Sequence, residues 1–535
     1  MLRATTYTHQ FCRHTAVSVV AKGKRTLTQQ ILLVIALLAL TSSCATNPVT
    51  GKNEISLFSE RWELSVGQQQ YQPGRQSQGG DYVVDPMVQA YVQEIGDKIA
   101  AVSDRPLPYE FAVINNSTPN AWALPGGKIA INRGLLTELN SESELAAVLS
   151  HEIIHAAAKH GAQGMQRGLV LQAAVLATTV ATTDAEYGKV AALGTGLGAQ
   201  LINSSYGRNA ERESDLYGMN YMSRAGYDPK GAVVLQETFV ALSGNRDSSF
   251  IQGLFASHPP SQQRVDANRA HLQQLPAGGI VGRERYQQMT RRLQQSKPAY
   301  AAYDNARTAL TDQRPDEARA LLEEAMTIEQ EEAQFYALLG DIETHENRLW
   351  SAARAFDKAT ALNPNYFYPH LRRGLLSHKR REYALAEVHL RRSVELLETA
   401  QAYNALGDIA NRDGREQEAE EYYAKAATDS GPSGQAAASS LVKLRVSNNP
   451  GAYISFETGS SSDGELLLGL SNTAPRDFRS VGYEISFVDV RGRSQSSSGS
   501  LTYIAANSKQ FVNTALRIAP SQVVSLRVTG LSLDE

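Results

Sequence analysis

Two histidines and a glutamate at fixed spacing form the strongest chemical signal in the sequence. His151, Glu152 and His155 make an H-E-x-x-H pattern, and positions i and i+4 share one face of a helix. Both imidazoles can therefore bind one zinc ion, while Glu152 accepts a proton from a water that the zinc activates. Apolar runs at 145–149 and 156–158 indicate a buried helix, in which a metal compensates the polar groups. The pattern predicts a metallopeptidase.

A catalytic zinc usually takes a third protein ligand from a separate element. Glu211 and Asp215 are four residues apart, so they share a helical face. Glu211 is the expected ligand, and Asp215 is expected to accept a hydrogen bond from the far nitrogen of a ligating histidine. The alternative is a charged, solvated helix face, because Arg208 and Arg212 lie in the same segment.

The two motifs together resemble the zinc metallopeptidase family that contains the CAAX prenyl endopeptidases, the heat-shock protease HtpX and the periplasmic protease BepA. Residues 120–129 and 257–265 resemble two further segments of that family, and the resemblance covers about residues 53–275. Ser214 departs from the family, which usually has alanine there. The resemblance implies one zinc ion per chain, with these roles: His151, His155 and Glu211 as ligands, Glu152 as base, Asp215 holding a ligating histidine.

A further candidate is His258, which lies in a Ser-His-Pro-Pro segment. One interpretation is a loop histidine at the entrance of a helix. The resemblance favours a catalytic or regulatory role, of which two are chemically possible. His258 could hold the enzyme latent by occupying the fourth metal position, or it could donate a hydrogen bond to the oxyanion formed at the scissile carbonyl.

The N-terminus has the features of a bacterial lipoprotein signal. An apolar run at residues 31–40 follows Lys22, Lys24 and Arg25, and is too short for a permanent membrane span. Small residues lead to Cys44, which we expect to become the lipidated N-terminus. The alternative is ordinary signal cleavage. Resemblance to such signals favours a periplasmic protein anchored to the outer membrane of a Gram-negative bacterium.

Beyond residue 276 the sequence repeats with a period of about 34 residues, the tetratricopeptide length. Small residues recur at equivalent positions of paired helices, where they allow the helices to approach closely. Large residues recur at other equivalent positions and fill the space between the helices. The repeating positions are Gly340, Gly374 and Gly407 in first helices, and Ala318, Ala352, Ala386 and Ala419, followed by Leu322, Phe356, Leu390 and Tyr423, in second helices. Such stacks form concave binding surfaces, so we expect this region to hold a partner or substrate.

Strand patterns appear in two places. Residues 450–535 contain short apolar segments separated by turns, which predict a small β-sandwich without chemistry of its own. Residues 128–131 alternate like a sheet edge, to which a peptide substrate would add as a strand. Between the zinc motifs, residues 169–201 predict two packed helices rich in small residues.

These observations predict an α+β multidomain protein: a mainly helical H-E-x-x-H peptidase with a small sheet, a tetratricopeptide α-solenoid and a β-sandwich. The expected parts are a signal peptide at 1–43, the peptidase at 44–276, a linker at 277–299, the repeats at 300–432 and the β domain at 450–535.

The predicted function is zinc-dependent endoproteolysis of misfolded or stalled envelope proteins. The repeats at 300–432 would bind substrates or the outer-membrane assembly machinery, and Cys44 would bind the membrane. A net charge of −3 without a basic stripe argues against nucleic-acid binding. The rival function is a chaperone or assembly factor with a latent or structural zinc site.

Overall fold

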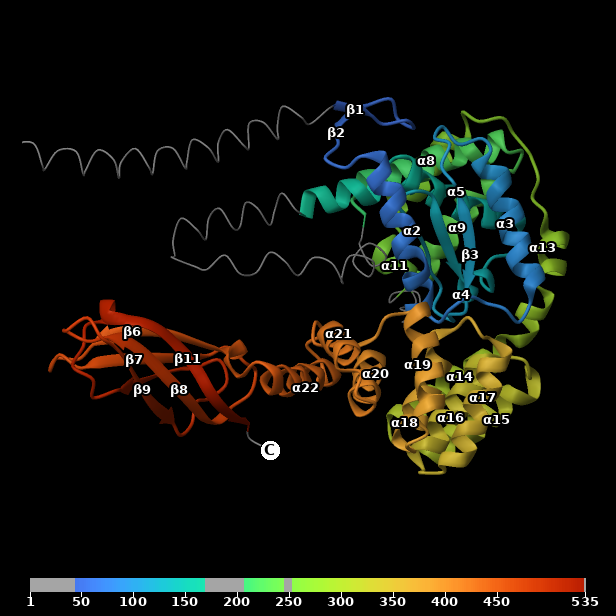
Figure 1. Cartoon of the computed structure of the whole chain (residues 1–535). Helices are drawn as coiled ribbons and strands as arrows, with labels where there is room; N and C mark the ends of the chain where they lie inside the picture. Colours follow the sequence, from blue (N-terminus) through green and yellow to red (C-terminus); the bar gives the residue numbers. More distant parts are fainter. Residues whose placement is uncertain (1–43, 169–205, 245–252, 534–535) are drawn as a thin grey trace, which may run out of the picture. The chain divides into compact units, whose positions relative to one another are not determined.

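The computed structural model describes residues 44–168, 206–244 and 253–533 (Figure 1). Its contacts divide the chain into two compact units, one ending at Lys297 and the other beginning at Pro298. Each unit is described by itself below.

Two sequence predictions lie outside the described residues: the signal peptide at 1–43 and the small-residue helices at 169–201. Cys44 is the first described residue and begins a short strand, β1 (Cys44–Thr46), which pairs with β2 (Asn53–Ile55). In the described part of the chain, no helix is both long and apolar enough to cross a membrane.

The first unit packs helices around a small mixed sheet. β5 (Lys128–Asn132) is the central strand, with β3 (Glu110–Ile114) parallel on one side and β4 (Ala121–Leu124) antiparallel on the other. The helices are α2 (Glu60–Ser77), α3 (Pro86–Ala100), α4 (Arg133–Leu136), α5 (Glu142–Ala157), α8 (Arg208–Arg224), α9 (Lys230–Gly244), α11 (Leu254–Ser257), α12 (Gln262–Leu272), α13 (Arg283–Met289) and the first part of α14 (Arg291–Thr311), which continues into the second unit.

The prediction that residues 128–131 form a sheet edge is wrong. β5 is hydrogen-bonded on both sides, and every residue in it is buried. The polar Lys128 that suggested alternation is itself only 3% exposed. Its ammonium pairs with the carboxylate of Glu110 on β3, whose side chain is 53% exposed. A buried lysine with a partner at the surface thus reproduces the sequence pattern of a half-exposed strand. Of the two edge strands, β3 is bridged on its outer side by Asp81, whereas no described strand pairs with the outer side of β4.

α5, which carries the H-E-x-x-H motif, begins at a well-formed cap. The Ser141 hydroxyl accepts a hydrogen bond from the Glu144 amide at 3.2 Å, and the Glu144 carboxylate accepts one from the Asn140 amide at 3.0 Å. These bonds satisfy donors that a helix start otherwise leaves free. Along α5 every residue except His151 is buried, as the flanking apolar runs predicted.

Residues 277–299, expected to be a linker, are largely helical. They contain α13 and the start of α14. Tyr286 on α13 is 1% exposed, and its hydroxyl donates to the Leu136 carbonyl at 2.6 Å. This segment therefore packs into the first unit.

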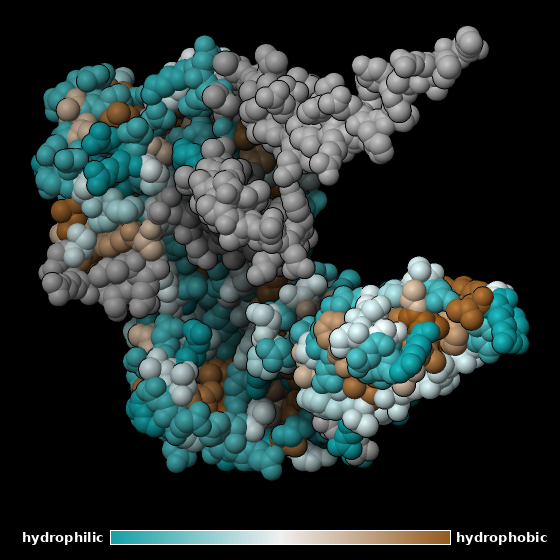
Figure 2. Space-filling model, turned by 90° about the vertical axis from the view of Figure 1, so that its left-hand side faces the viewer, coloured by the Kyte–Doolittle hydropathy of each residue, from teal (hydrophilic) through white to brown (hydrophobic). Residues whose placement is uncertain are grey.

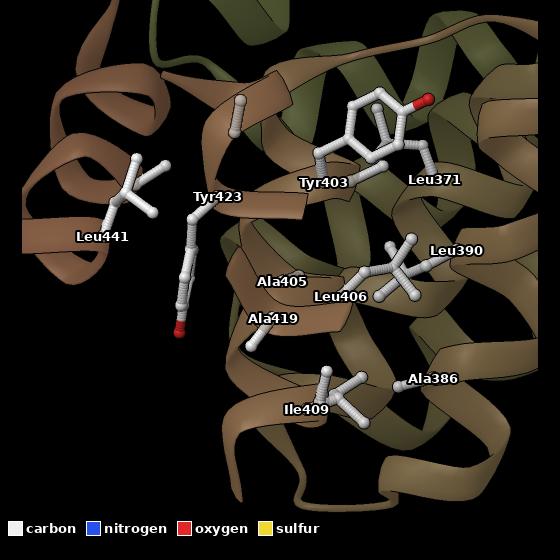
Figure 3. Close-up of a cluster of buried hydrophobic side chains, with 14 residues drawn as sticks. Leu371, Ala386, Leu390, Tyr403, Ala405, Leu406, Ile409, Ala419, Tyr423 and Leu441 are labelled. Carbon is white, nitrogen blue, oxygen red and sulfur yellow. The ribbon is translucent and has the colours of Figure 1, made fainter. Parts of the chain in front are cut away.

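The second unit begins with paired helices. They are α15 (Pro315–Ile328), α16 (Ala333–His345), α17 (Leu349–Leu362), α18 (Phe367–Lys379), α19 (Tyr383–Leu396), α20 (Ala400–Arg412), α21 (Glu416–Ala426) and α22 (Pro432–Asn448). Buried residues of successive helices, including Leu390, Leu406 and Ile409, form one cluster between the pairs (Figure 3). The helices follow the predicted repeat period.

Two three-stranded antiparallel sheets follow the helices. Their strand orders are β10-β7-β6 and β11-β8-β9. The strands are β6 (Ile454–Ser460), β7 (Leu466–Asn472), β8 (Phe478–Val488), β9 (Ser494–Leu501), β10 (Lys509–Asn513) and β11 (Val523–Leu533). Inward residues of β7 and β8, together with Val442 and Val446 of α22, form one apolar cluster. Alternate residues of β7 and β8 thus give this region its own core.

Candidate metal centre

Three elements bring four polar side chains to one point of the first unit. His151 and His155 come from successive turns of α5, Glu211 from the first turn of α8, and His258 from the C-terminal end of α11. Each offers one potential ligand atom, and these atoms all lie within 4.8 Å of one another. The structure therefore brings together all three ligands expected from the sequence, and His258 with them.

The spacing of these atoms suits a metal ion. The His151 Nε2 atom lies 3.0 Å from His155 Nε2 and 3.6 Å from Glu211 Oε2, and His155 Nε2 lies 3.4 Å from Glu211 Oε1. A tetrahedral zinc with bonds of about 2.1 Å separates its ligands by about 3.4 Å. The side chains of His155, Glu211 and His151 are 0%, 4% and 12% exposed. Converging buried lone pairs of this kind fit a cation.

Glu152 lies next to this cluster and is not part of it. Its side chain is 2% exposed, its Oε1 atom lies 3.6 Å from His258 Nε2, and its Oε2 atom has no hydrogen-bond partner among the described residues. Burial raises the pKa of Glu152, although His258 and His151 oppose that effect. A buried carboxyl with a spare oxygen and a raised pKa is suited to exchanging protons.

Asp215, predicted to hold a ligating histidine, lies beside His151. Asp215 lies one helical turn after Glu211 on α8, and its Oδ1 atom is 3.1 Å from His151 Nδ1. Burial alone would raise the pKa of Asp215, but the guanidinium of Arg264 outweighs it and lowers that pKa. When His151 carries its proton on Nδ1, it donates a hydrogen bond to the ionised Asp215, and its Nε2 lone pair faces the cluster.

Sequence reasoning missed the role of Arg264 on α12. Its Nε and Nη2 atoms donate to the two oxygens of Asp215 at 2.6 and 2.7 Å, and its Nη1 atom lies 2.9 Å from Glu211 Oε2. One buried guanidinium thus fixes both acidic side chains. Arg264 lies within the 257–265 segment that resembled the family, but no spacing rule connects it to a helix 49 residues earlier.

His160 and Tyr206 were also missed, and both contact His155. The Nδ1 atoms of His160 and His155 lie 3.0 Å apart, and the ring of Tyr206 stacks on that of His155 with centroids 3.8 Å apart. The His160 Nε2 atom lies 3.5 Å from Glu213 Oε2. These contacts fix the ring plane of His155. The only sequence feature that could have indicated a contact between His160 and His155 is their separation by five residues.

His258 occupies a position that fits both of its possible roles. Its Nδ1 atom lies 3.0 Å from Glu211 Oε1 and 3.3 Å from His151 Nε2. Burial disfavours the protonated ring, but Glu211 and Glu152 outweigh burial and raise the pKa of His258. The histidine caps α11, and its amide donates to the Leu254 carbonyl at 2.7 Å, so its backbone is anchored beside the cluster.

A small cavity of about 40 Å³ adjoins the cluster. His151, Glu152 and His258 line one side of it, and apolar side chains such as Leu235 and Phe239 of α9 line another. Apolar side chains thus lie directly beside His151, Glu152 and His258.

Comparison with known proteins agrees with this geometry. Residues 86–271 match peptidase family M48, and residues 303–367 and 371–435 match tetratricopeptide repeats. A putative beta-barrel assembly-enhancing protease of Vibrio cholerae is 30% identical over 199 residues, covering 36% of this chain and 40% of that protein. The beta-barrel assembly-enhancing protease of Escherichia coli strain K12 is 27% identical over 331 residues, covering 55% and 68%.

A eukaryotic protein matches part of the chain as well. Mitochondrial metalloendopeptidase OMA1 of Schizosaccharomyces pombe is 34% identical over 177 residues, covering 33% of this chain and 50% of that protein. The match thus spans less than half of the Vibrio relative and half of the yeast one. The segment that matches peptidase family M48 contains α5, α8 and α11, which contribute the four side chains of the cluster, and also Arg264.

Proposed function

We propose that this M48-type metallopeptidase with tetratricopeptide repeats is a zinc-dependent endopeptidase of the bacterial cell envelope that cleaves misfolded or stalled outer-membrane and periplasmic proteins. The observation that carries the proposal is the convergence of His151, His155 and Glu211 beside the buried carboxyl of Glu152. The family match and the names of the bacterial relatives support the same activity.

In this proposal His151, His155 and Glu211 hold the zinc. Zinc, when bound, supplies polarisation of the scissile carbonyl and acidifies a water molecule. Glu152 accepts the proton of the attacking water and returns it to the leaving amine, for which its raised pKa is suited. Asp215 and Arg264 keep the ligand side chains in place while this happens.

The substrate would approach along β4, the open edge of the small sheet. Extended peptides add to such edges through main-chain hydrogen bonds. The Tyr206 hydroxyl donates to the Ala123 carbonyl on this edge at 3.4 Å. The ring of the same tyrosine stacks on the ring of His155. A substrate strand on β4 would therefore run next to the metal ligands.

The envelope location rests on the N-terminal sequence. Cleavage before Cys44 followed by lipidation would anchor the chain, and more than one acyl chain is needed for stable residence in a membrane. Mass spectrometry of the mature N-terminus tests this part. An unmodified Cys44, or a mature chain that starts elsewhere, would reject the anchor and leave the peptidase proposal intact.

Metal analysis together with peptide hydrolysis tests the enzyme itself. The purified chain should contain one zinc ion and cleave an unfolded outer-membrane protein, and a chelator should stop cleavage. Glu211→Ala should lose both the metal and the activity. Glu237→Ala, an exposed glutamate of α9 paired with Arg269, is the matched control and should retain both. Full zinc occupancy in Glu211→Ala would show that the third ligand is wrong.

A second candidate function is a chaperone or assembly factor whose zinc site is latent. The position of His258 favours it, since this ring contacts Glu211 and His151 where a fourth ligand would lie. If His258 maintains latency, His258→Ala should raise basal cleavage, including self-cleavage. If it is an oxyanion donor, the same change should lower turnover about 100-fold or more with zinc retained. Unchanged rates would reject both roles.

A further inference from the structure

A cleft of about 440 Å³ opens beside the metal centre. Its wall includes Glu211, one of the four clustered side chains, and Arg264, which contacts Glu211. Pro259 and Pro260, between α11 and α12, line another part of it. The cleft is far larger than the apolar cavity of about 40 Å³ on the same cluster. It therefore has room for a substrate side chain next to the metal ligands.

Tyr206 connects this cleft to the strand that the proposed substrate would follow. Its side chain lines the cleft, its ring stacks on His155, and its hydroxyl donates to the Ala123 carbonyl of β4. Successive side chains of an extended peptide point to opposite faces of a sheet. A peptide paired with β4 would thus have side chains near its scissile bond at the mouth of the cleft.

Two arginines of α8 give the cleft a positive charge. Arg208 and Arg212 are four residues apart, so they share a face of the helix, and both line the cleft and are exposed. The Arg212 Nη2 atom donates to Gln263 Oε1 of α12 at 3.2 Å, which holds this guanidinium at the cleft. Within the described part of the chain, neither arginine forms an ion pair.

This lack of a partner sets the two arginines apart from their neighbours. Hydrophilic residues cover much of the surface drawn in colour in Figure 2, so an exposed arginine does not by itself indicate a binding site. The remaining arginines of α8 and α12, however, all form ion pairs: Arg224 with Asp104, Arg264 with Asp215 and Arg269 with Glu237. The unpaired guanidinium groups of these two helices are those that line the cleft.

Glu211 does not cancel the positive charge. It is the one carboxylate among the described residues that line the cleft, and it already lies 2.9 Å from the Arg264 guanidinium. In the proposed function it also binds the zinc. Three arginines against one glutamate leave the lining with a net positive charge. Such a lining favours an anionic group, and a carboxylate accepts paired hydrogen bonds from a guanidinium.

We propose that this cleft is a substrate subsite in which Arg208 and Arg212 bind an aspartate or glutamate side chain close to the scissile bond. The inference rests on the proposed function, since the acidic side chain belongs to a peptide that the enzyme cleaves. The enzyme would prefer unfolded segments that carry a carboxylate near the cut. It would reject segments with lysine or arginine there, because like charges would meet in the cleft.

Peptide binding to the full chain tests this, in a Glu152→Gln background so that nothing is cleaved. The probes are fluorescein-labelled twelve-residue peptides that together cover an unfolded outer-membrane protein, and binding is followed by fluorescence anisotropy. Their C-termini are amidated, so that only side chains supply carboxylates. The tightest-binding peptide should contain aspartate or glutamate. Exchanging these residues for asparagine or glutamine should weaken binding about tenfold, and added salt should reduce the difference.

Substitutions in the cleft identify where the carboxylate binds. Arg208→Gln and Arg212→Gln should each reduce the preference for the acidic peptide, and the double variant should abolish it. Arg212→Lys should keep part of it, because lysine retains the charge without the paired donors. Arg269→Gln, which replaces an exposed arginine of α12 outside the cleft, is the matched control and should keep the full preference. Elemental analysis should find zinc in every variant, which shows that the metal centre is intact.

Equal binding of the acidic and amide forms by the parent chain overturns the proposal, as does a preference that survives in the double variant. Peptides that bind only with a free C-terminus also overturn it, because the cleft then holds a chain end. Cleavage by the chain with Glu152 separates this proposal from the proposed activity. If both forms are cleaved with equal kcat/KM, the activity stands and the subsite is wrong. If neither is cleaved while the arginine-dependent preference persists, the activity is wrong and the carboxylate site stands.

Discussion

The metal centre and the repeats bury their residues for opposite purposes. Around α5 and α8, charged and polar side chains are buried, and Glu152 Oε2 is left without a hydrogen bond. In the repeats, a helical glycine faces a large side chain 16 residues later, and a Cβ on Gly340 would lie 2.5 Å from the ring of Phe356. The first region gives up stability to place reactive groups, whereas the second gains stability from close backbone approach.

The repeat pairing recurs with different large residues. A Cβ on Gly374 would lie 2.6 Å from Leu390, and one on Gly407 would lie 2.6 Å from Tyr423; Figure 3 shows these two large side chains within the cluster. The glycine is constant while its partner is aliphatic or aromatic. The repeat thus requires only that a small residue leave space for the side chain of a neighbouring helix. The metal centre, in contrast, requires specific nitrogen and oxygen atoms at fixed positions.

Glu152→Gln should have the largest effect and should separate activity from stability. Hydrolysis should fall by about 10²–10⁴-fold, because the group that moves the proton is lost. Zinc should stay bound, and the unfolding free energy should stay equal or rise, since an unpaired buried carboxyl becomes a neutral amide. Peptide hydrolysis, elemental analysis and urea unfolding measure the three quantities. A large loss of stability would show that Glu152 is structural, and the contrast between the regions would fail.

Gly340→Ala should have the reverse effect. The added methyl group overlaps the rigid ring of Phe356, so α16 and α17 should lose about 1–3 kcal/mol of unfolding free energy. Hydrolysis of a short peptide should stay within about twofold, because the site lies in the other unit. Hydrogen exchange in α16 and α17 measures the loss. Adding Phe356→Leu should restore part of it, and no recovery would argue against this contact as the cause.

The smallest expected effect is a pH dependence in the repeats. Burial lowers the pKa of His389 to about 4, and its Nδ1 atom lies 3.2 Å from His370 Nδ1. Between about pH 6.5 and pH 4, His389 is therefore protonated in the unfolded chain but neutral in the folded chain. Stability should fall over that range as the pH falls, by on the order of 1–2 kcal/mol.

Urea unfolding at pH 7 and pH 5 checks this expectation for the parent chain and for His389→Gln. The substitution should flatten the pH dependence, because glutamine does not titrate. His345→Gln, which replaces an exposed histidine of α16 bonded to Gln313, is the control and should leave the pH dependence as it is. Equal slopes in the parent chain and His389→Gln would exclude His389 as the source.

The sequence by itself determined the features that depend on local spacing. Four-residue separations placed His151 with His155 and Glu211 with Asp215, since a helix fixes those geometries. The repeat period gave the paired helices for the same reason, and alternation with turns gave the C-terminal strands. Each rule operates within one element or between neighbouring elements.

Only the tertiary structure decided what depends on contacts between distant segments. Arg264 contacts both Glu211 and Asp215, although it lies 49 residues after Asp215 in the sequence. No local sequence pattern indicates that its guanidinium makes these contacts. The polar Lys128 suggested an exposed position in an edge strand, but it is buried. Its partner Glu110 lies on another strand and permits that burial. The position of β9 at the edge of its sheet likewise follows from strand order. Strand order and ion pairs are set by the free energy of the whole packed unit, which short-range spacing does not encode.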